Sequence, residues 1–162
     1  MAKKRDTATS PATALAGFIG KFAPEHQRVI RSARRVLRRR FPTANELVYD
    51  NYNFFVIGYS PTDRPSDTIV SLAAGASGVG LSFYRGATLP DPERRLLGSG
   101  TQNRFIRLPS AAVLKEPGIE ALIAAAVRQA RVPLPTAGGR RLVVRSVSAK
   151  QRPRIRLKAS LD

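Results

Sequence analysis

The stretch that decides the fold is residues 24–59, which read PEHQRVIRSARRVLRRRFPTANELVYDNYNFFVIGY. In its first half, apolar residues recur at the spacing of one helix face, and Pro24 occupies a first-turn position where no backbone N–H is needed. These apolar residues are Val29, Ile30, Ala33, Val36 and Leu37. After Pro42, the part from Glu46 onward is rich in aromatic and β-branched residues, which favour strands. The stretch therefore predicts one helix followed by one long strand or two short ones.

Sequence patterns on both sides of this stretch predict the remaining elements. A short helix begins at Ser10-Pro11, and a longer one begins at Glu116-Pro117 with apolar residues at i, i+3, i+4 and i+7. Strands are predicted over 68–73, 79–84 and 104–108, with an edge strand or extension over 141–147. Helices that are separated from strands along the chain are typical of the α+β class. We therefore expect a mainly antiparallel β-sheet of about five strands, packed by two N-terminal helices and one C-terminal helix.

The length of 162 residues is typical of one domain with its own core. We expect a basic N-terminal tail over 1–10, a single α+β domain over 11–147 and a basic C-terminal tail over 148–162. The chain contains no cysteine, which excludes disulfides, thiolate zinc sites and thiol nucleophiles. Its longest apolar run, 121–127, is far shorter than the roughly 20 residues that cross a bilayer. These features predict a cytoplasmic protein without membrane contact.

The formal net charge is +17, and most of it lies in three parts of the chain. The first ten residues, the predicted helix over 24–41 and the region 140–162 are basic, and the helix carries seven arginines against one glutamate. Local basic surfaces of this kind attract polyanions such as nucleic acids. The alternative is a helix face that is only solvated, with the apolar stripe packed on its other side. The candidate polyanion-binding residues are Arg28, Arg31, Arg34, Arg35, Arg38 and Arg39 in the helix and Arg152, Arg154 and Arg156 in the C-terminal tail.

Several short motifs occur together in one order along the chain. They are Arg40-Phe41-Pro42, Tyr49-Asp50-Asn51-Tyr52, Val79-Gly80-Leu81-Ser82-Phe83-Tyr84, Asp91-Pro92, Leu96-Leu97-Gly98-Ser99-Gly100 and Arg104-Phe105-Ile106-Arg107. Over about residues 15–131, the order and the motifs resemble the YdhG-like family of domains of unknown function. The resemblance implies an antiparallel sheet backed by helices, related loosely to the frataxin-like architecture.

Some members of that family are regarded as iron carriers for iron–sulfur cluster assembly, so the resemblance also implies that role. Frataxin-like iron delivery depends on an acidic helix surface, whereas the helix over 24–41 is rich in arginine. Hard iron sites need carboxylates or imidazoles, and the acidic residues of this chain are scattered along the sequence. We therefore place an iron carrier behind the other functions, and we expect no metal site.

The sequence offers few residues for catalysis. His26 is the only histidine, and no nucleophile-elbow motif accompanies it. The glycine-rich stretch 75–80 lies between two predicted strands and lacks the lysine of a phosphate loop, so it predicts a hairpin turn. We expect no catalytic residue and no cofactor, and hence a protein that is not an enzyme.

A cluster of polar and aromatic residues gives the remaining candidate site. Tyr49, Asn51 and Asn53 would share one face of an extended strand, because side chains alternate along it. Together with Tyr84 and Arg104, they would line a small ligand pocket on an open sheet face; the alternative is a strand edge with these groups in water. The preferred function is therefore a non-catalytic module that binds a small ligand or a protein. Binding of nucleic acid or another polyanion is the alternative.

Overall fold

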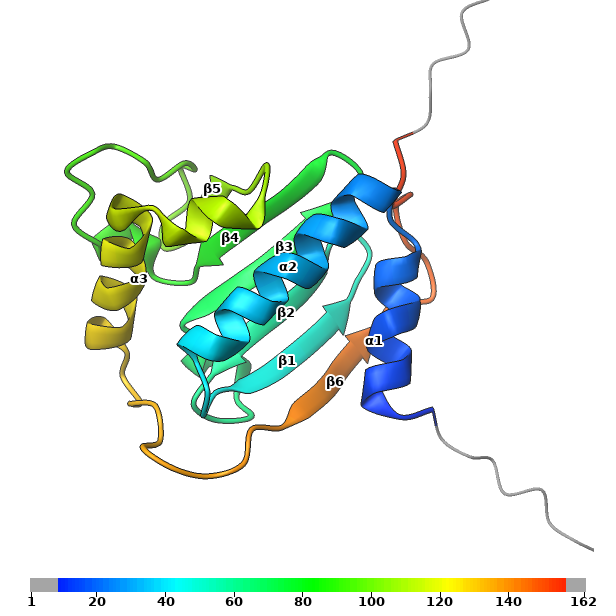
Figure 1. Ribbon diagram of the computed structural model, residues 1–162, viewed down its shortest axis with the longest axis horizontal. Helices are drawn as coiled ribbons and strands as arrows, with labels where there is room; N and C mark the ends of the chain where they lie inside the picture. The colour runs from blue at the N-terminus through cyan, green and yellow to red at the C-terminus, as the bar shows by residue number, and fades with distance from the viewer. Residues whose placement is uncertain (1–8, 157–162) are drawn as a thin grey trace, which may run out of the picture.

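The computed structural model describes residues 9–156, which form one six-stranded sheet packed with three α-helices (Figure 1). The helices are α1 (Pro11–Gly20), α2 (Pro24–Arg40) and α3 (Pro117–Gln129). The strands are β1 (Asn45–Asp50), β2 (Phe55–Ser60), β3 (Val70–Gly75), β4 (Gly78–Phe83), β5 (Arg104–Arg107) and β6 (Leu142–Val147). None of the helices in this range has both the length and the apolar character that a membrane span requires. The predicted α+β class is confirmed.

The strands lie in the order β5-β4-β3-β2-β1-β6. The pairings from β5 to β1 are antiparallel, whereas β6 runs parallel to β1. Parallel neighbours need a long connection. Here the chain leaves α3 and runs around the ends of the strands, at the bottom of the view in Figure 1, before it enters β6. The edge strand that the sequence predicts over 141–147 is therefore present, as the one parallel strand of the described sheet.

The hydrophobic core lies between the helices and one face of the sheet, and α2 lies lengthwise over this face, roughly along the direction of the strands (Figure 1). In β4, Val79, Leu81 and Phe83 are buried on this face, while the residues between them are half-buried on the other. In α2, Ile30 and Leu37 are buried at helical spacing. The periodicities read from the sequence thus predict correctly which sides of this helix and this strand face the core.

The chain reverses direction directly after β1. Asp50, the last residue of β1, pairs with Phe55, the first residue of β2. The Asn51 N–H donates to the Phe54 carbonyl at 3.1 Å, which closes the turn between the strands. The sequence left open whether one long strand or two short ones follow the helix, and the structure has two.

The segment 148–156 packs against the end of β1. The Ser148 N–H donates to the Asp50 carbonyl, and the Arg152 N–H donates to the Tyr52 carbonyl, both at 2.9 Å. These backbone hydrogen bonds keep residues 148–152 attached to the domain, beyond the boundary that the sequence predicts at residue 147. The remainder of the predicted tails, residues 1–8 and 157–162, lies outside the described residues.

Candidate functional site

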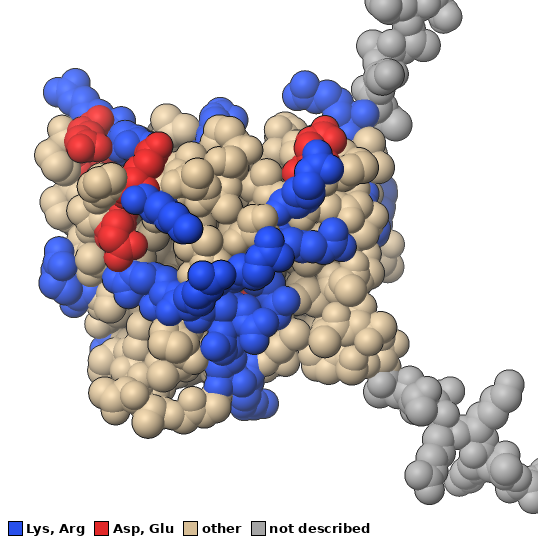
Figure 2. All heavy atoms as spheres, viewed as in Figure 1, with Lys and Arg blue, Asp and Glu red and all other residues tan. Residues whose placement is uncertain are grey.

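Four exposed arginines form a straight stripe on the outer side of α2. They are Arg28, Arg31, Arg35 and Arg39, and we call them the outer arginine stripe. Spacings of three and four residues place side chains on one helix face, and a rise of 1.5 Å per residue makes the stripe roughly 16 Å long. Figure 2 shows the basic side chains as a continuous band along α2. Within residues 9–156, no carboxylate forms an ion pair with any of the four.

Neutral side chains orient two members of the stripe. One terminal nitrogen of Arg31 donates to Gln27 Oε1 at 3.0 Å, and one of Arg35 donates to Ser32 Oγ at 3.2 Å. Each guanidinium keeps further N–H groups, because arginine carries five donors. The two side chains are therefore held along the helix with donors left for an external acceptor.

The inner arginines of α2 bind a buried carboxylate instead. Arg34 donates two hydrogen bonds to Glu46 of β1, at 2.9 and 3.0 Å, and Arg38 Nε lies 3.6 Å from Glu46 Oε1. Glu46 is 1% exposed and also accepts a hydrogen bond from the Tyr59 hydroxyl. The sequence predicted Arg34 and Arg38 on the solvated face, but both positions lie on the flank of α2 that faces β1. Arg34 is therefore not available to a polyanion.

The Glu46 cluster shifts the pKa values of its neighbours. The hydrogen bond to Glu46 raises the pKa of Arg34, and burial does not outweigh it. Burial, followed by the charge of Glu46, raises the pKa of Tyr59 well above its ordinary value. The arginine therefore stays charged and the tyrosine stays protonated, so the cluster is a fixed ion pair between α2 and β1.

The C-terminal end of the inner flank is fixed as well. Arg40 Nε donates to Glu120 Oε1 of α3 at 2.8 Å. One terminal nitrogen of Arg140 donates to the Arg38 carbonyl at 3.3 Å, which adds a further basic side chain beside the C-terminal end of α2. Of the seven arginines of the helix, the four in the outer stripe are thus the ones without a described carboxylate partner.

Arg154 of the C-terminal segment is buried. It is 4% exposed and donates to Asp50 Oδ1 at 2.9 Å and to the Asn51 carbonyl at 2.6 Å. This placement corrects its assignment as a polyanion-binding residue, because its charge is already used inside the fold. Arg152 and Arg156 are exposed, and the Arg152 guanidinium lies over the Tyr52 ring.

Asp50 is the carboxylate at the centre of this second cluster. Its side chain is fully buried, and Lys21 of the α1–α2 turn forms an ion pair with it beside Arg154. Burial opposes ionisation of this carboxyl, but the hydrogen bonds from Lys21, Arg154 and Gln151 outweigh burial and lower the pKa of Asp50. Asp50 is therefore a structural anion that attaches segment 148–156.

The five residues of the predicted pocket do not come together. Tyr49 is at the end of β1, and Asn51 and Asn53 lie in the turn that follows, so the alternation expected of a continuous strand is interrupted. Tyr84 and Arg104 lie at the opposite end of the sheet, on the far side of β2 and β3, where Arg104 pairs with the last residue of β4. The predicted pocket required side chains to alternate along an extended strand over residues 49–53, whereas the chain turns directly after Asp50.

A different hollow lies on the sheet face that the core does not use. Its volume is about 750 Å³, and it runs along β3, β4 and β5 and around the β3–β4 turn to the start of α2. Small residues line its centre, namely Ser71, Ala73, Gly80 and Ser82, while Phe54 and Phe105 stand at its sides. The alternation of Gly80 and Ser82 with buried residues indicates this open face, but no sequence pattern indicates a hollow on it.

Comparisons with known proteins add no relative. No protein-family model, no curated protein and no solved structure matches this chain. The resemblance to the YdhG-like family therefore stays a prediction. Within residues 9–156, the structure contains no group of three or more histidines and carboxylates placed to hold a metal ion.

Proposed function

We propose that this protein binds double-stranded nucleic acid through the outer arginine stripe, as a non-catalytic module that contacts the phosphate backbone without sequence preference. The observation that carries the proposal is the stripe itself, which places four exposed arginines on one face of α2. Within the described residues, none of these arginines forms an ion pair with a carboxylate. Guanidinium groups bind phosphate oxygens through paired, charge-assisted hydrogen bonds. The net charge of +17 supplies long-range attraction to the same partner.

The arrangement of the stripe costs the folded protein stability. Like charges three or four residues apart on a helix repel one another, each pair by about 0.2–0.5 kcal/mol. Arg31, Arg35 and Arg39 follow one another at intervals of four residues. A surface that is only solvated would be more stable with acidic residues interspersed, so this repulsion supports an anionic partner.

The composition of the stripe favours a duplex over a single strand. Proteins that bind single strands without sequence preference stack bases on aromatic side chains. The exposed aromatic residues of the described chain, Tyr52, Phe54 and Tyr84, lie outside α2. A helix that offers only guanidinium groups can contact phosphates but has no surface on which bases stack.

The proposal is tested by a titration of the full chain with a fluorescently labelled duplex at low salt. Arg31→Gln/Arg35→Gln removes the centre of the stripe, and we expect it to weaken binding at least tenfold, because each charged hydrogen bond contributes about 1.5–3 kcal/mol. The matched control is Arg64→Gln/Arg128→Gln, which removes the same charge from exposed sites outside α2. The proposal fails if both variants weaken binding equally or if the unlabelled single strand competes better than the duplex.

A second candidate function is the binding of a small apolar ligand in the hollow on the open sheet face. It is favoured by the volume of about 750 Å³ and by the small residues that line its centre. Pockets of this size are typical of small-molecule sites. A titration with Nile red, a neutral apolar dye, tests it, with Ala73→Leu to fill the hollow and Ala87→Leu, an exposed site outside it, as the control. Equal dye binding by both variants would contradict this function.

A further inference from the structure

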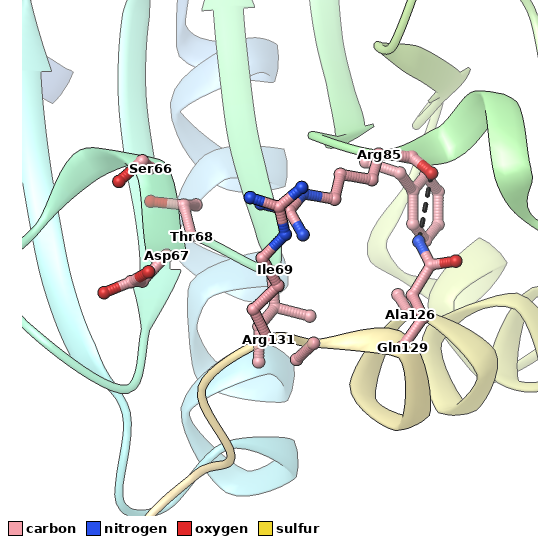
Figure 3. Close-up of a pocket in the computed structure, with 10 residues that line it drawn as sticks. Ser66, Asp67, Thr68, Ile69, Arg85, Ala126, Gln129 and Arg131 are labelled. Carbon is pink, nitrogen blue, oxygen red and sulfur yellow. Dashed lines mark hydrogen bonds between the residues drawn. The ribbon is translucent and has the colours of Figure 1, made fainter.

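A second, smaller hollow lies between the start of β3 and the C-terminal end of α3 (Figure 3). Its volume is about 20 Å³, which is room for about one water molecule or for an oxygen atom of a larger group. Its walls come from the loop 66–69, from Arg85 after β4 and from Gln129 and Arg131 at the end of α3. It is separate from the outer arginine stripe, because none of the stripe residues lines it.

Two guanidinium groups share this hollow. Figure 3 shows the side chains of Arg85 and Arg131 extending toward each other across its mouth. Within residues 9–156, neither arginine forms an ion pair with a carboxylate. Asp67 also lines the hollow, but its Oδ2 accepts a hydrogen bond from the Thr62 hydroxyl at 2.7 Å, and Figure 3 shows its carboxylate directed away from both arginines.

The backbone that carries the two arginines is fixed. The Arg85 carbonyl accepts a hydrogen bond from Gln129 Nε2 at 3.0 Å, drawn as the dashed line in Figure 3, and the Thr88 hydroxyl lies 3.0 Å from the same oxygen. Arg131 follows two residues after Gln129, where α3 has ended. The end of β4 and the end of α3 are thus joined directly beneath the two side chains.

Two cations that face one small hollow repel each other unless an anion lies between them. The planar forks of two arginines bind the oxygens of a phosphoryl group in pairs. We propose that this hollow is a binding site for one phosphoryl group, either free phosphate or the terminal phosphate of a small ester, held between Arg85 and Arg131.

The competing explanation is that these arginines only interact with the negative end of the α3 dipole. That role requires a cation near the last carbonyls of α3, which Arg128 in the last turn already supplies. It gives no reason for a second arginine, Arg85 after β4, to share the same hollow. The two explanations differ in one measurable respect, which is saturable binding of phosphate.

The test is a ¹⁵N NMR titration of the full chain with inorganic phosphate at constant ionic strength. We expect a saturable shift of the amide signals of Thr68, Arg85 and Arg131, with one site per chain. Arg131→Gln should raise the dissociation constant at least tenfold, since a charged hydrogen bond contributes about 1.5–3 kcal/mol. Arg128→Gln, an exposed site on the same helix, should leave it within about twofold, as surface changes normally do.

Two further arms make the result decisive. Lys115→Gln/Lys150→Gln, at exposed sites outside the hollow and outside α2, should bind phosphate as the unchanged chain does, which separates this site from the overall positive charge. Arg85→Lys keeps the charge but loses the fork, and it should bind more weakly. Three results would each overturn the proposal. The first is a set of amide shifts that spreads over all exposed arginines and does not saturate. The others are an unchanged dissociation constant in Arg131→Gln and acetate binding as tight as phosphate binding.

Discussion

Arg34 holds the carboxylate of Glu46 by two hydrogen bonds, from Nε to Oε2 at 2.9 Å and from a terminal nitrogen to Oε1 at 3.0 Å. This pair joins α2 to β1 and divides the arginines of the helix into two groups. Arg34 and Arg38 face Glu46 on the inner flank, while the outer arginine stripe faces away from the sheet. The same helix therefore contributes to stability on one side and offers free positive charge on the other.

Glu46→Gln should destabilise the fold. Removing one partner of a buried ion pair leaves the other without compensation and costs about 3–5 kcal/mol. Arg34 keeps part of its side chain in water, so we expect about 2–3 kcal/mol. Urea denaturation followed by circular dichroism measures the change. The control is Glu120→Gln, which removes the carboxylate of an exposed pair with Arg40 and should cost less than about 1 kcal/mol. Equal losses of unfolding free energy in the two variants would show that the buried Glu46 pair contributes no more to stability than an exposed pair.

The stability of the protein should depend on pH in acid through Asp50. The pKa of its carboxyl is lower in the folded state than the ordinary value of 3.8, so the unfolded chain binds more protons in this range and stability rises with pH. The contribution is complete above about pH 5 and is lost as the pH falls through the folded-state pKa. Asp50→Asn should therefore unfold with a flatter pH dependence between about pH 2 and 5. Glu25→Gln, at an exposed carboxylate that belongs to none of the described ion pairs, serves as the control.

Segment 148–156 should depend on Arg154 for its attachment. Arg154→Leu leaves Lys21 as the one cation paired with Asp50 in the described chain, and the loss of a buried charged hydrogen bond should cost about 1.5–3 kcal/mol. Amide hydrogen exchange should then become faster at Ser148 and Arg152, whose N–H groups bind β1 and the following turn. Arg152→Leu, at an exposed site, is the comparison. Unchanged exchange in Arg154→Leu would show that the segment is held by its backbone alone.

Neutralising the outer arginine stripe should stabilise the isolated protein. Arg31→Gln/Arg35→Gln removes three repulsive pairs, with Arg28, with Arg39 and between the two residues themselves, for a gain of about 1 kcal/mol at low salt. Salt should reduce the difference, because it screens exposed charges. Thermal unfolding at two ionic strengths measures both effects. A variant that is less stable than the original chain would mean that these arginine side chains contribute to packing within the fold and are not kept free for an anionic partner.

The elements of the fold could be predicted because each carries a local pattern. The apolar stripe of α2, the alternation of β4 and the prolines at helix starts all act within a few residues. The pairing of β6 with β1 depends on contacts between residues about 100 positions apart, and no local pattern encodes such a contact. The sequence therefore predicted the edge strand itself, but its parallel pairing with β1 is visible only in the structure.

The candidate site was only partly predictable for the same reason. Helical spacing was enough to place Arg28, Arg31, Arg35 and Arg39 on one face. It did not reveal that Glu46 would be buried opposite the flank of α2, or that Asp50 would bind Arg154 from the end of the described chain. Charge seen in a sequence shows where cations are, but only the fold shows which of them are already paired.

The most direct test of the account is the salt dependence of duplex binding. For a duplex, the logarithm of the association constant falls by about 0.9 for each neutralised phosphate per decade of salt, so four arginines predict a slope of about −4. Arg31→Gln/Arg35→Gln should reduce the slope to about −2, and Arg64→Gln/Arg128→Gln should leave it near −4. Equal slopes for the two variants, or no dependence on salt, would contradict the claim that the outer arginine stripe binds nucleic acid.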